Sequence, residues 1–118
     1  MEETLQSARP FEQFVLLSVV ELSVKGETPA HSYDVAETAR DRLDDVDREP
    51  FGGVERQEVI SALRALAEED VLAKDRTESA TGKGRPAYEL AVDADTVLDN
   101  LEDAETVGSY AEALRADA

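Results

Sequence analysis

The feature that most constrains the fold is a change of hydrophobic period near residue 71. Before it, apolar residues recur at the spacing of α-helices in three segments. The first is expected to start at Pro10, which suits a first helical turn, and to run to Gly26. The second begins at His31 or Ser32, with Ser32 as a cap, and its apolar residues continue at helical spacing to Val46. The third spans about 54–69, after a Pro- and Gly-containing loop over 47–53.

After the change, two short segments alternate like strands. Val71–Arg76 and Arg85–Val92 flank a glycine-containing turn at 81–84, which predicts a β-hairpin. Asp93 is then expected to cap a last helix reaching Arg115. The order helix, helix, helix, hairpin, helix predicts a mainly α protein with a small β-hairpin, a winged helix-turn-helix (α-α-α-β-β-α). Residues 1–92 would form the winged helix-turn-helix and 93–118 a C-terminal helix, within one structural unit.

Apolar residues cover nearly the whole circumference of the first helix, and a helix of that kind is buried on more than one side. The last helix carries an apolar stripe of near-heptad spacing that needs a surface to pack against. Both features predict packing on a second subunit as well as on the chain's own core. The residues expected at this dimer interface are Phe11, Phe14, Val97, Leu98, Leu101, Ala104, Ala111 and Leu114.

The net charge of −16 restricts the environment in which this chain folds. Self-repulsion of that size disfavours a compact state, but molar salt shortens the Debye length to about 3 Å and screens it. With 9 Arg against 3 Lys, counted along the sequence, the composition favours a halophile protein with salt cations as loosely bound counterions; an acidic mesophile protein is the alternative.

Other features of the sequence bear on compartment and chemistry. The chain has no cysteine, which excludes disulfides and thiolate-ligated zinc. The apolar run Phe14–Val24 is too short to span a bilayer and contains Glu21. Because the sequence opens Met1-Glu2-Glu3, unlike a basic signal peptide, a cytoplasmic location without membrane contact is expected.

Residues 71–88 reverse the prevailing charge. They hold four basic residues, Lys74, Arg76, Lys83 and Arg85, against two acidic ones. The alternative is a loop whose charges serve only to keep the protein soluble. That alternative explains the Lys and Arg residues poorly, because the rest of the chain is kept soluble by Asp and Glu. Basic hairpin tips beside a recognition helix reach phosphates or a minor groove, so these four are predicted DNA contacts.

The third helix presents a polar face. Helical projection puts Gln57, Ser61 and Arg64 opposite the apolar residues, with Arg56 beside them in the first turn. Arg and Gln side chains suit bidentate contacts with guanine and adenine edges. This face is predicted to enter the major groove of double-stranded DNA, the alternative being an ordinary solvated helix face.

Three segments, in this order and spacing, resemble the PadR-type winged-helix transcriptional regulators: SYDVAETARDRL (32–43), ISALRALAEEDVL (60–72) and KGRPAYELA (83–91). With the acidity, the sequence looks like a haloarchaeal member. The resemblance implies a homodimer, held mainly by the C-terminal helix, on a pseudo-palindromic site. Arg64, Lys83, Arg85 and Tyr88 match by position, Tyr88 being expected to support the hairpin. The family often opens its recognition helix with a threonine-leucine-tyrosine-proline run, and this chain has Glu58-Val59-Ile60-Ser61 there.

The remaining candidates are weaker. His31, the only histidine, rules out a His-based metal cluster or triad and at most touches a phosphate. An acidic cluster, Asp41, Asp44, Asp45, Asp47 and Glu49, is expected to be a solvated surface rather than an ion site. No catalytic constellation, cofactor or metal is expected. The competing function is a winged-helix protein-interaction module whose acidic surface imitates DNA.

Overall fold

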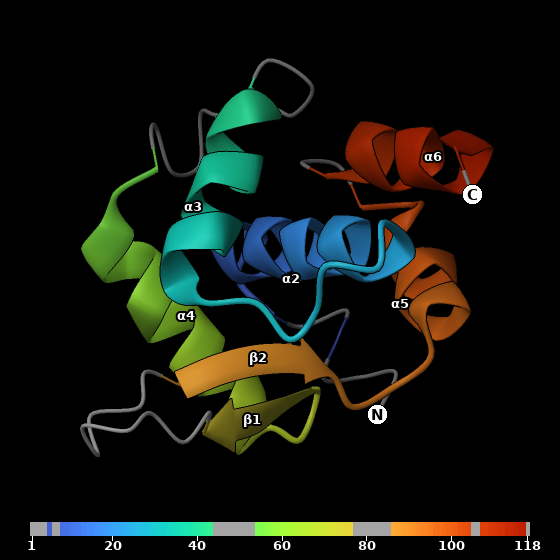
Figure 1. Cartoon of the computed structure of the whole chain (residues 1–118). Coiled ribbons are helices and arrows are strands. Elements are labelled where there is room, and N and C mark those ends of the chain that lie inside the picture. Colours follow the sequence, from blue (N-terminus) through green and yellow to red (C-terminus); the bar gives the residue numbers. More distant parts are fainter. Residues whose placement is uncertain (1–4, 6–7, 44–53, 77–85, 105–106, 118) are drawn as a thin grey trace.

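The computed structural model describes residues 5, 8–43, 54–76, 86–104 and 107–117, except the side chains of 75, 76, 86 and 117. The chain is mainly helical with a two-stranded antiparallel sheet (Figure 1). The elements are α2 (Pro10–Val24), α3 (Ser32–Asp41), α4 (Arg56–Glu68), β1 (Leu72–Arg76), β2 (Pro86–Leu90), α5 (Ala94–Leu101) and α6 (Gly108–Asp117).

Helix α2 is the centre of the fold. All its residues from Gln13 to Leu22 are buried, and α3, α4, β2, α5 and α6 all contact it (Figure 1). The prediction of a helix buried on several sides is therefore confirmed for α2. The covering elements, however, belong to the same chain, so the apolar circumference no longer calls for a second subunit.

Two helix ends orient the segments that follow them. After α2, Gly26 adopts φ 74°, and the N–H of Glu27 donates to the carbonyl of Leu22. After α4, Asp70 takes the same left-handed conformation at φ 63°, and the N–H of Val71 donates to the carbonyl of Leu66. Both patterns are those of a Schellman motif. The second one turns the chain directly from α4 into β1.

The hairpin pairs Leu72 with Leu90 and Lys74 with Tyr88 across the two strands. Its expected strands are confirmed, with ends that differ by one or two residues. Ala30, between α2 and α3, adds a further antiparallel bridge on the other side of β2: its N–H and carbonyl bond the carbonyl and N–H of Tyr88 at 2.9 and 2.8 Å. The order across this small sheet is thus Ala30, β2, β1.

The expected single C-terminal helix is wrong. Helix α5 ends at Leu101 and α6 begins at Gly108. At the turn, the N–H of Gly108 donates to the carbonyl of Ala104, and a Cβ on Gly108 would lie 2.6 Å from the carbonyl oxygen of Glu102. The break lets α6 fold back onto α2 (Figure 1). It buries the apolar stripe inside one chain, which a continuous helix would leave exposed.

Smaller expectations also change. Ser32 is the first residue of α3 and His31 precedes it as the N-cap, its N–H 3.4 Å from a carboxylate oxygen of Asp34. Asp93 occupies the N-cap position of α5, as expected, but its side chain makes no capping hydrogen bond. The loop expected over 47–53 and the end of the stripe at Val46 lie outside the described residues.

Candidate nucleic-acid interface

The polar face expected on the third helix is present on α4. Gln57, Ser61 and Arg64 are exposed, as is Arg56 in the first turn. The opposite face supplies Val59, Ala62, Leu63 and Leu66 to the core. The buried face fixes the rotation of α4, so the exposed side chains are free to meet a partner along its length.

The charge on this face is mixed. Arg56 and Arg64 share the helix and its N-cap with three exposed glutamates, Glu55, Glu58 and Glu68. Such a surface does not attract a polyanion by charge alone. Arginine, glutamine and glutamate side chains can form hydrogen bonds with the edges of guanine, adenine and cytosine, respectively.

The basic hairpin is only partly described. Lys74 is exposed on β1, opposite the buried Tyr88. Tyr88 is 4 % exposed and bridges Ala30, so it supports the hairpin. Arg76 belongs to β1, but its side chain lies outside the described residues, as do Lys83 and Arg85 entirely. Of the four basic residues that are predicted to contact DNA from the hairpin, the structure describes the side chain of Lys74 alone.

A groove separates the start of α2 from the exposed face of α4. It holds about 480 Å³. The side chains along it are Arg9, Phe11, Glu12, Gln57, Glu58, Ser61 and Ala62. Arg9 was not among the residues predicted to contact DNA; its position next to Pro10 was the available clue, because it puts an arginine at a helix start. The fold brings Arg9 to the groove that Gln57 and Ser61 line.

The residues expected at a dimer interface are mostly inside the single chain. Six of them are at most 3 % exposed: Phe14, Val97, Leu98, Leu101, Ala111 and Leu114. Phe11 and Ala104 are partly buried against the same core. The apolar stripes are predicted to pack on a second subunit as well as on the chain's own core, but α5 and α6 fold onto α2 and cover them within the chain. An interface between copies of this folded chain would not use the six buried side chains.

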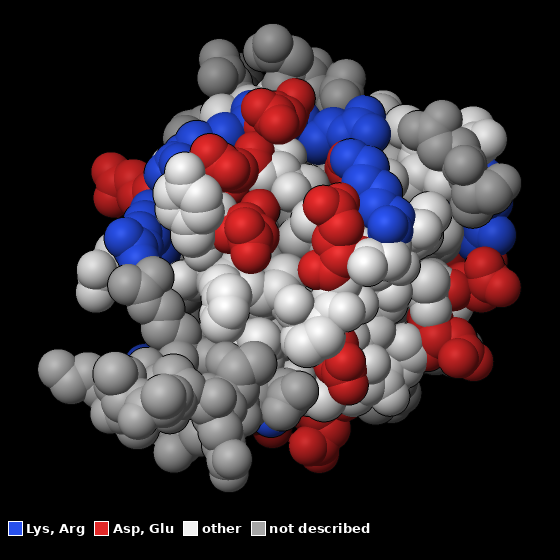
Figure 2. Space-filling model, viewed as in Figure 1, with Lys and Arg blue, Asp and Glu red and all other residues white. Residues whose placement is uncertain are grey.

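Acidic side chains are spread over much of the face displayed in Figure 2. Asp41 lines a hollow of about 270 Å³ between α2 and α3, together with Glu27, Asp34, Glu37 and the cation Lys25. The other members of the predicted acidic cluster, Asp44, Asp45, Asp47 and Glu49, lie outside the described residues. Within the described part of the chain, no group of three or more His, Asp or Glu residues is placed to hold a metal ion.

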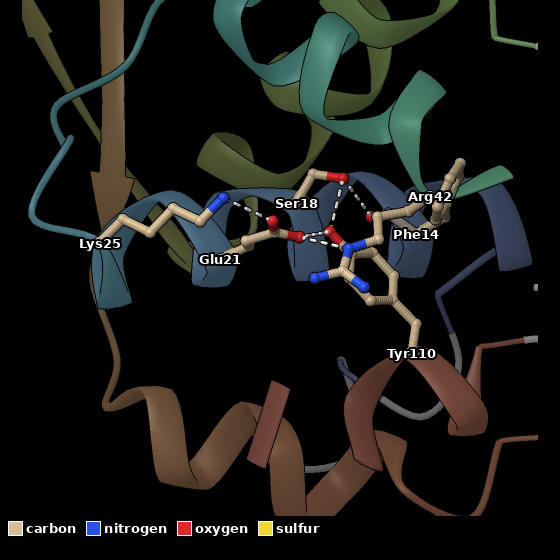
Figure 3. A network of polar contacts seen from close by, with 6 residues as sticks. All are labelled: Phe14, Ser18, Glu21, Lys25, Arg42 and Tyr110. Carbon is tan, nitrogen blue, oxygen red and sulfur yellow. Dashed lines mark hydrogen bonds and ion pairs between the residues drawn. The ribbon is translucent and has the colours of Figure 1, made fainter. Parts of the chain in front are cut away.

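A buried polar network, missed from the sequence, joins α2, the end of α3 and α6 (Figure 3). Glu21, in the last turn of apolar α2, has a side chain only 8 % exposed. Its carboxylate accepts hydrogen bonds from Arg42 Nε at 2.9 Å, Lys25 Nζ at 2.9 Å and the Tyr110 hydroxyl at 2.8 Å. A charge in an otherwise apolar helix was the available clue, because a buried carboxylate requires partners.

The same contacts determine how these groups ionise. Burial raises the pKa of Glu21, but the hydrogen bonds from Arg42, Lys25 and Tyr110 lower it by a larger amount. The net pKa of this carboxyl is therefore below its ordinary value. Burial also raises the pKa of Tyr110 well above that of a free tyrosine. Glu21 is therefore an ionised buried carboxylate, and Tyr110 is a neutral donor to it.

No protein-family model and no curated protein matches this sequence. Among the helices of the described residues, none is both long enough and apolar enough to cross a membrane.

Proposed function

We propose that this chain is a winged helix-turn-helix protein that binds double-stranded DNA and regulates transcription. Helix α4 would lie in the major groove, and the hairpin would act as the wing on the backbone or minor groove. Arg56, Gln57, Ser61 and Arg64 would then face the bases or flanking phosphates. Lys74, Arg76, Lys83 and Arg85 would contact the backbone or the minor groove.

The observation that carries the proposal is the bridge between Ala30 and Tyr88. In a winged helix, a short strand between the first two helices pairs with the last strand of the hairpin. Here Ala30, between α2 and α3, pairs with β2, which pairs in turn with β1. A simple helical bundle with an appended hairpin does not require a pairing between the segment that joins its first two helices and the hairpin. The exposed polar face of α4 supports the same assignment.

The resemblance to PadR-type regulators extends the proposal to a homodimer on a pseudo-palindromic site. Two copies related by a two-fold axis would read two half-sites whose spacing reflects their separation. The contact between the copies would lie outside the six buried side chains named above.

Salt dependence follows from the charge. A dimer of chains at −16 each meets a polyanion, and the α4 face adds more carboxylates than guanidinium groups. In dilute buffer this repulsion opposes binding, and molar salt screens it. We expect affinity that persists or rises from tenths of molar to molar KCl, whereas basic DNA-binding proteins lose roughly 10³–10⁵ in affinity between 50 and 200 mM salt.

The test is selection of bound fragments from a random DNA library in molar KCl, followed by sequencing and a KCl titration on the enriched site. Enrichment of a two-fold symmetric sequence would support the proposal. Failure to enrich any sequence at any salt concentration would refute sequence-specific binding, and a steep loss of affinity with KCl would refute the account of the charge.

One observation favours a second candidate, a protein-interaction module with a DNA-like acidic surface. Three glutamates stand against two arginines along α4 and its N-cap. A basic protein partner would be attracted to such a surface. In that case DNA selection would fail, while a polycation such as polylysine would bind tightly at low salt and be released by KCl.

A further inference from the structure

The groove between α2 and α4 continues the proposed DNA-reading face beyond α4 itself. We propose that the sugar-phosphate backbone of bound DNA runs along this groove and that Arg9 contacts a phosphate there. The inference rests on the proposed DNA-binding function, and it adds both a residue and a path for the backbone.

Arg9 is suited to this contact by its position. It is exposed and has extended backbone angles, φ −64° and ψ 149°, immediately before the first residue of α2. Its side chain makes no ion pair with any residue that the structure describes. Guanidinium groups bind phosphate through paired, charge-assisted hydrogen bonds. An exposed arginine in an acidic chain, without an acidic partner in the described region, is available for an external anion.

The residues across the groove from Arg9 indicate what a phosphate contact of Arg9 would do. Gln57 and Ser61 line the same groove and belong to the α4 face proposed to read bases. When bases meet these side chains, the backbone of one strand must pass at the edge of the helix. Phosphate contacts at that edge set the register of a protein on the duplex without reading sequence. Arg9 would therefore position α4 rather than select bases.

Glu58 supplies an opposing charge in the same groove. Its carboxylate is exposed in the first turn of α4 and would repel a nearby phosphate. Glu12, also at the groove, has an oxygen 3.4 Å from the Arg9 N–H, so it acts partly as a cap on α2. A backbone in the groove would thus be attracted by Arg9 and repelled by two carboxylates, Glu58 and Glu12. Neutralising Arg9 and neutralising Glu58 should therefore change affinity in opposite directions.

The experiment measures Kd for a selected site and for a scrambled duplex at several KCl concentrations. Arg9→Gln should weaken both complexes by about threefold to tenfold and shift the slope of log affinity against log KCl concentration by about +0.9, the contribution of one phosphate contact. Glu58→Gln should strengthen both complexes. Equal effects on the two duplexes would mark a backbone contact.

Two controls carry the same charge changes elsewhere. Lys25→Gln lies at the other end of α2, roughly 24 Å from Arg9 along the helix axis. Glu112→Gln changes a residue of α6, and this helix packs on α2 away from α4 (Figure 1). Neither should change Kd by as much as twofold. Circular dichroism of each variant checks that the helices are retained.

The outcomes separate this inference from the proposed function. If the wild-type chain selects DNA but Arg9→Gln behaves like Lys25→Gln, the backbone path is wrong and the DNA-binding function stands. If either groove variant changes the preferred sequence instead of the overall affinity, the groove faces bases and the phosphate contact is wrong. If the wild-type chain binds no DNA at any salt concentration, both proposals fall.

Discussion

The hydroxyl of Tyr110 donates a hydrogen bond of 2.8 Å to Oε1 of Glu21, which ties α6 to the last turn of α2 (Figure 3). Arg42, at the end of α3, donates to the same oxygen and lies 5.3 Å from the centroid of the Tyr110 ring. The ring also packs edge-on against Phe14, with centroids 5.8 Å apart. One buried carboxylate thus joins three helices, and the C-terminal helix is held by a polar contact as well as by apolar packing.

Replacing Tyr110 with Phe should destabilise the fold while preserving its shape. The variant removes one donor from a buried carboxylate, a loss of about 1–3 kcal/mol in the free energy of unfolding. Denaturant unfolding in molar KCl measures it. Tyr33→Phe is the matched control, because Tyr33 is 52 % exposed and its hydroxyl bonds an exposed Glu37; its effect should stay within about 0.5 kcal/mol. Equal losses in the two variants would contradict the network's contribution.

Stability should fall in acid partly through Glu21. Burial raises its pKa, but bonds from Arg42, Lys25 and Tyr110 lower it more, so the folded chain holds this proton less tightly than the unfolded chain. Stability from the ionised group is therefore present above its ordinary pKa of about 4.3 and is lost as pH falls through the lower folded-state value.

Glu21→Gln tests this pH dependence. At neutral pH we expect the variant to be less stable than wild type, and the difference should shrink as the pH falls below about 4. Unfolding curves across that range at fixed KCl give the difference directly. Ser109→Ala, an exposed change on α6 that removes no ionisable group, should show no such pH-dependent difference. A Glu21→Gln penalty that stayed constant down to the acid limit would rule out the linkage.

Gly108→Ala should destabilise the turn between α5 and α6. Ala normally favours a helix over Gly by about 1 kcal/mol, but here its Cβ would meet the Glu102 carbonyl oxygen at 2.6 Å. Overpacking of this kind costs about 1–3 kcal/mol. Ser109→Ala, at the next and exposed position, should be close to neutral. Thermal unfolding of the pair distinguishes a steric effect from helix propensity, and a stabilised Gly108→Ala would show that the turn relaxes freely.

Leu114→Ala should weaken the fold of each chain rather than association between chains. Leu114 is 3 % exposed in the single chain, and truncating a buried leucine costs about 2–5 kcal/mol. The loss should be the same over a roughly hundredfold range of protein concentration, because a subunit interface would make it concentration-dependent. Analytical ultracentrifugation of both proteins should show an unchanged monomer–dimer balance. If Leu114→Ala made the dimer dissociate, Leu114 would contribute to the subunit interface and the prediction would be wrong.

Arg64→Ala and Lys74→Ala should have different effects on DNA binding. Arg64 is on the exposed face of α4, so its loss should remove discrimination between the selected site and variants, about 1–3 kcal/mol at the affected base pair. Lys74 is on β1, and its loss should weaken every duplex similarly. Competition assays with single-base variants of the selected site make the comparison. An unchanged sequence preference in Arg64→Ala would remove α4 from the major groove.

The order of the elements as far as the hairpin and the orientation of α4 were predictable from the sequence. Its apolar residues Val59, Leu63 and Leu66 recur at helical spacing, which alone fixes which face is buried and leaves Gln57, Ser61 and Arg64 outside. The alternation over 71–92 likewise predicted the hairpin, because a period of two commits side chains to opposite faces. These are local properties of the chain, and the tertiary structure did not alter them.

Tertiary structure decided what covers each apolar face. Periodicity shows that the stripe containing Val97, Leu101 and Leu114 must be buried, but it does not say whether a second subunit or the same chain buries it. The close approach at Gly108 turns α6 back onto α2, and Tyr110 finds Glu21 across a separation of 89 residues. Burial within one chain requires only a permitted turn, and no local pattern encodes the distant surface on which that turn places α6.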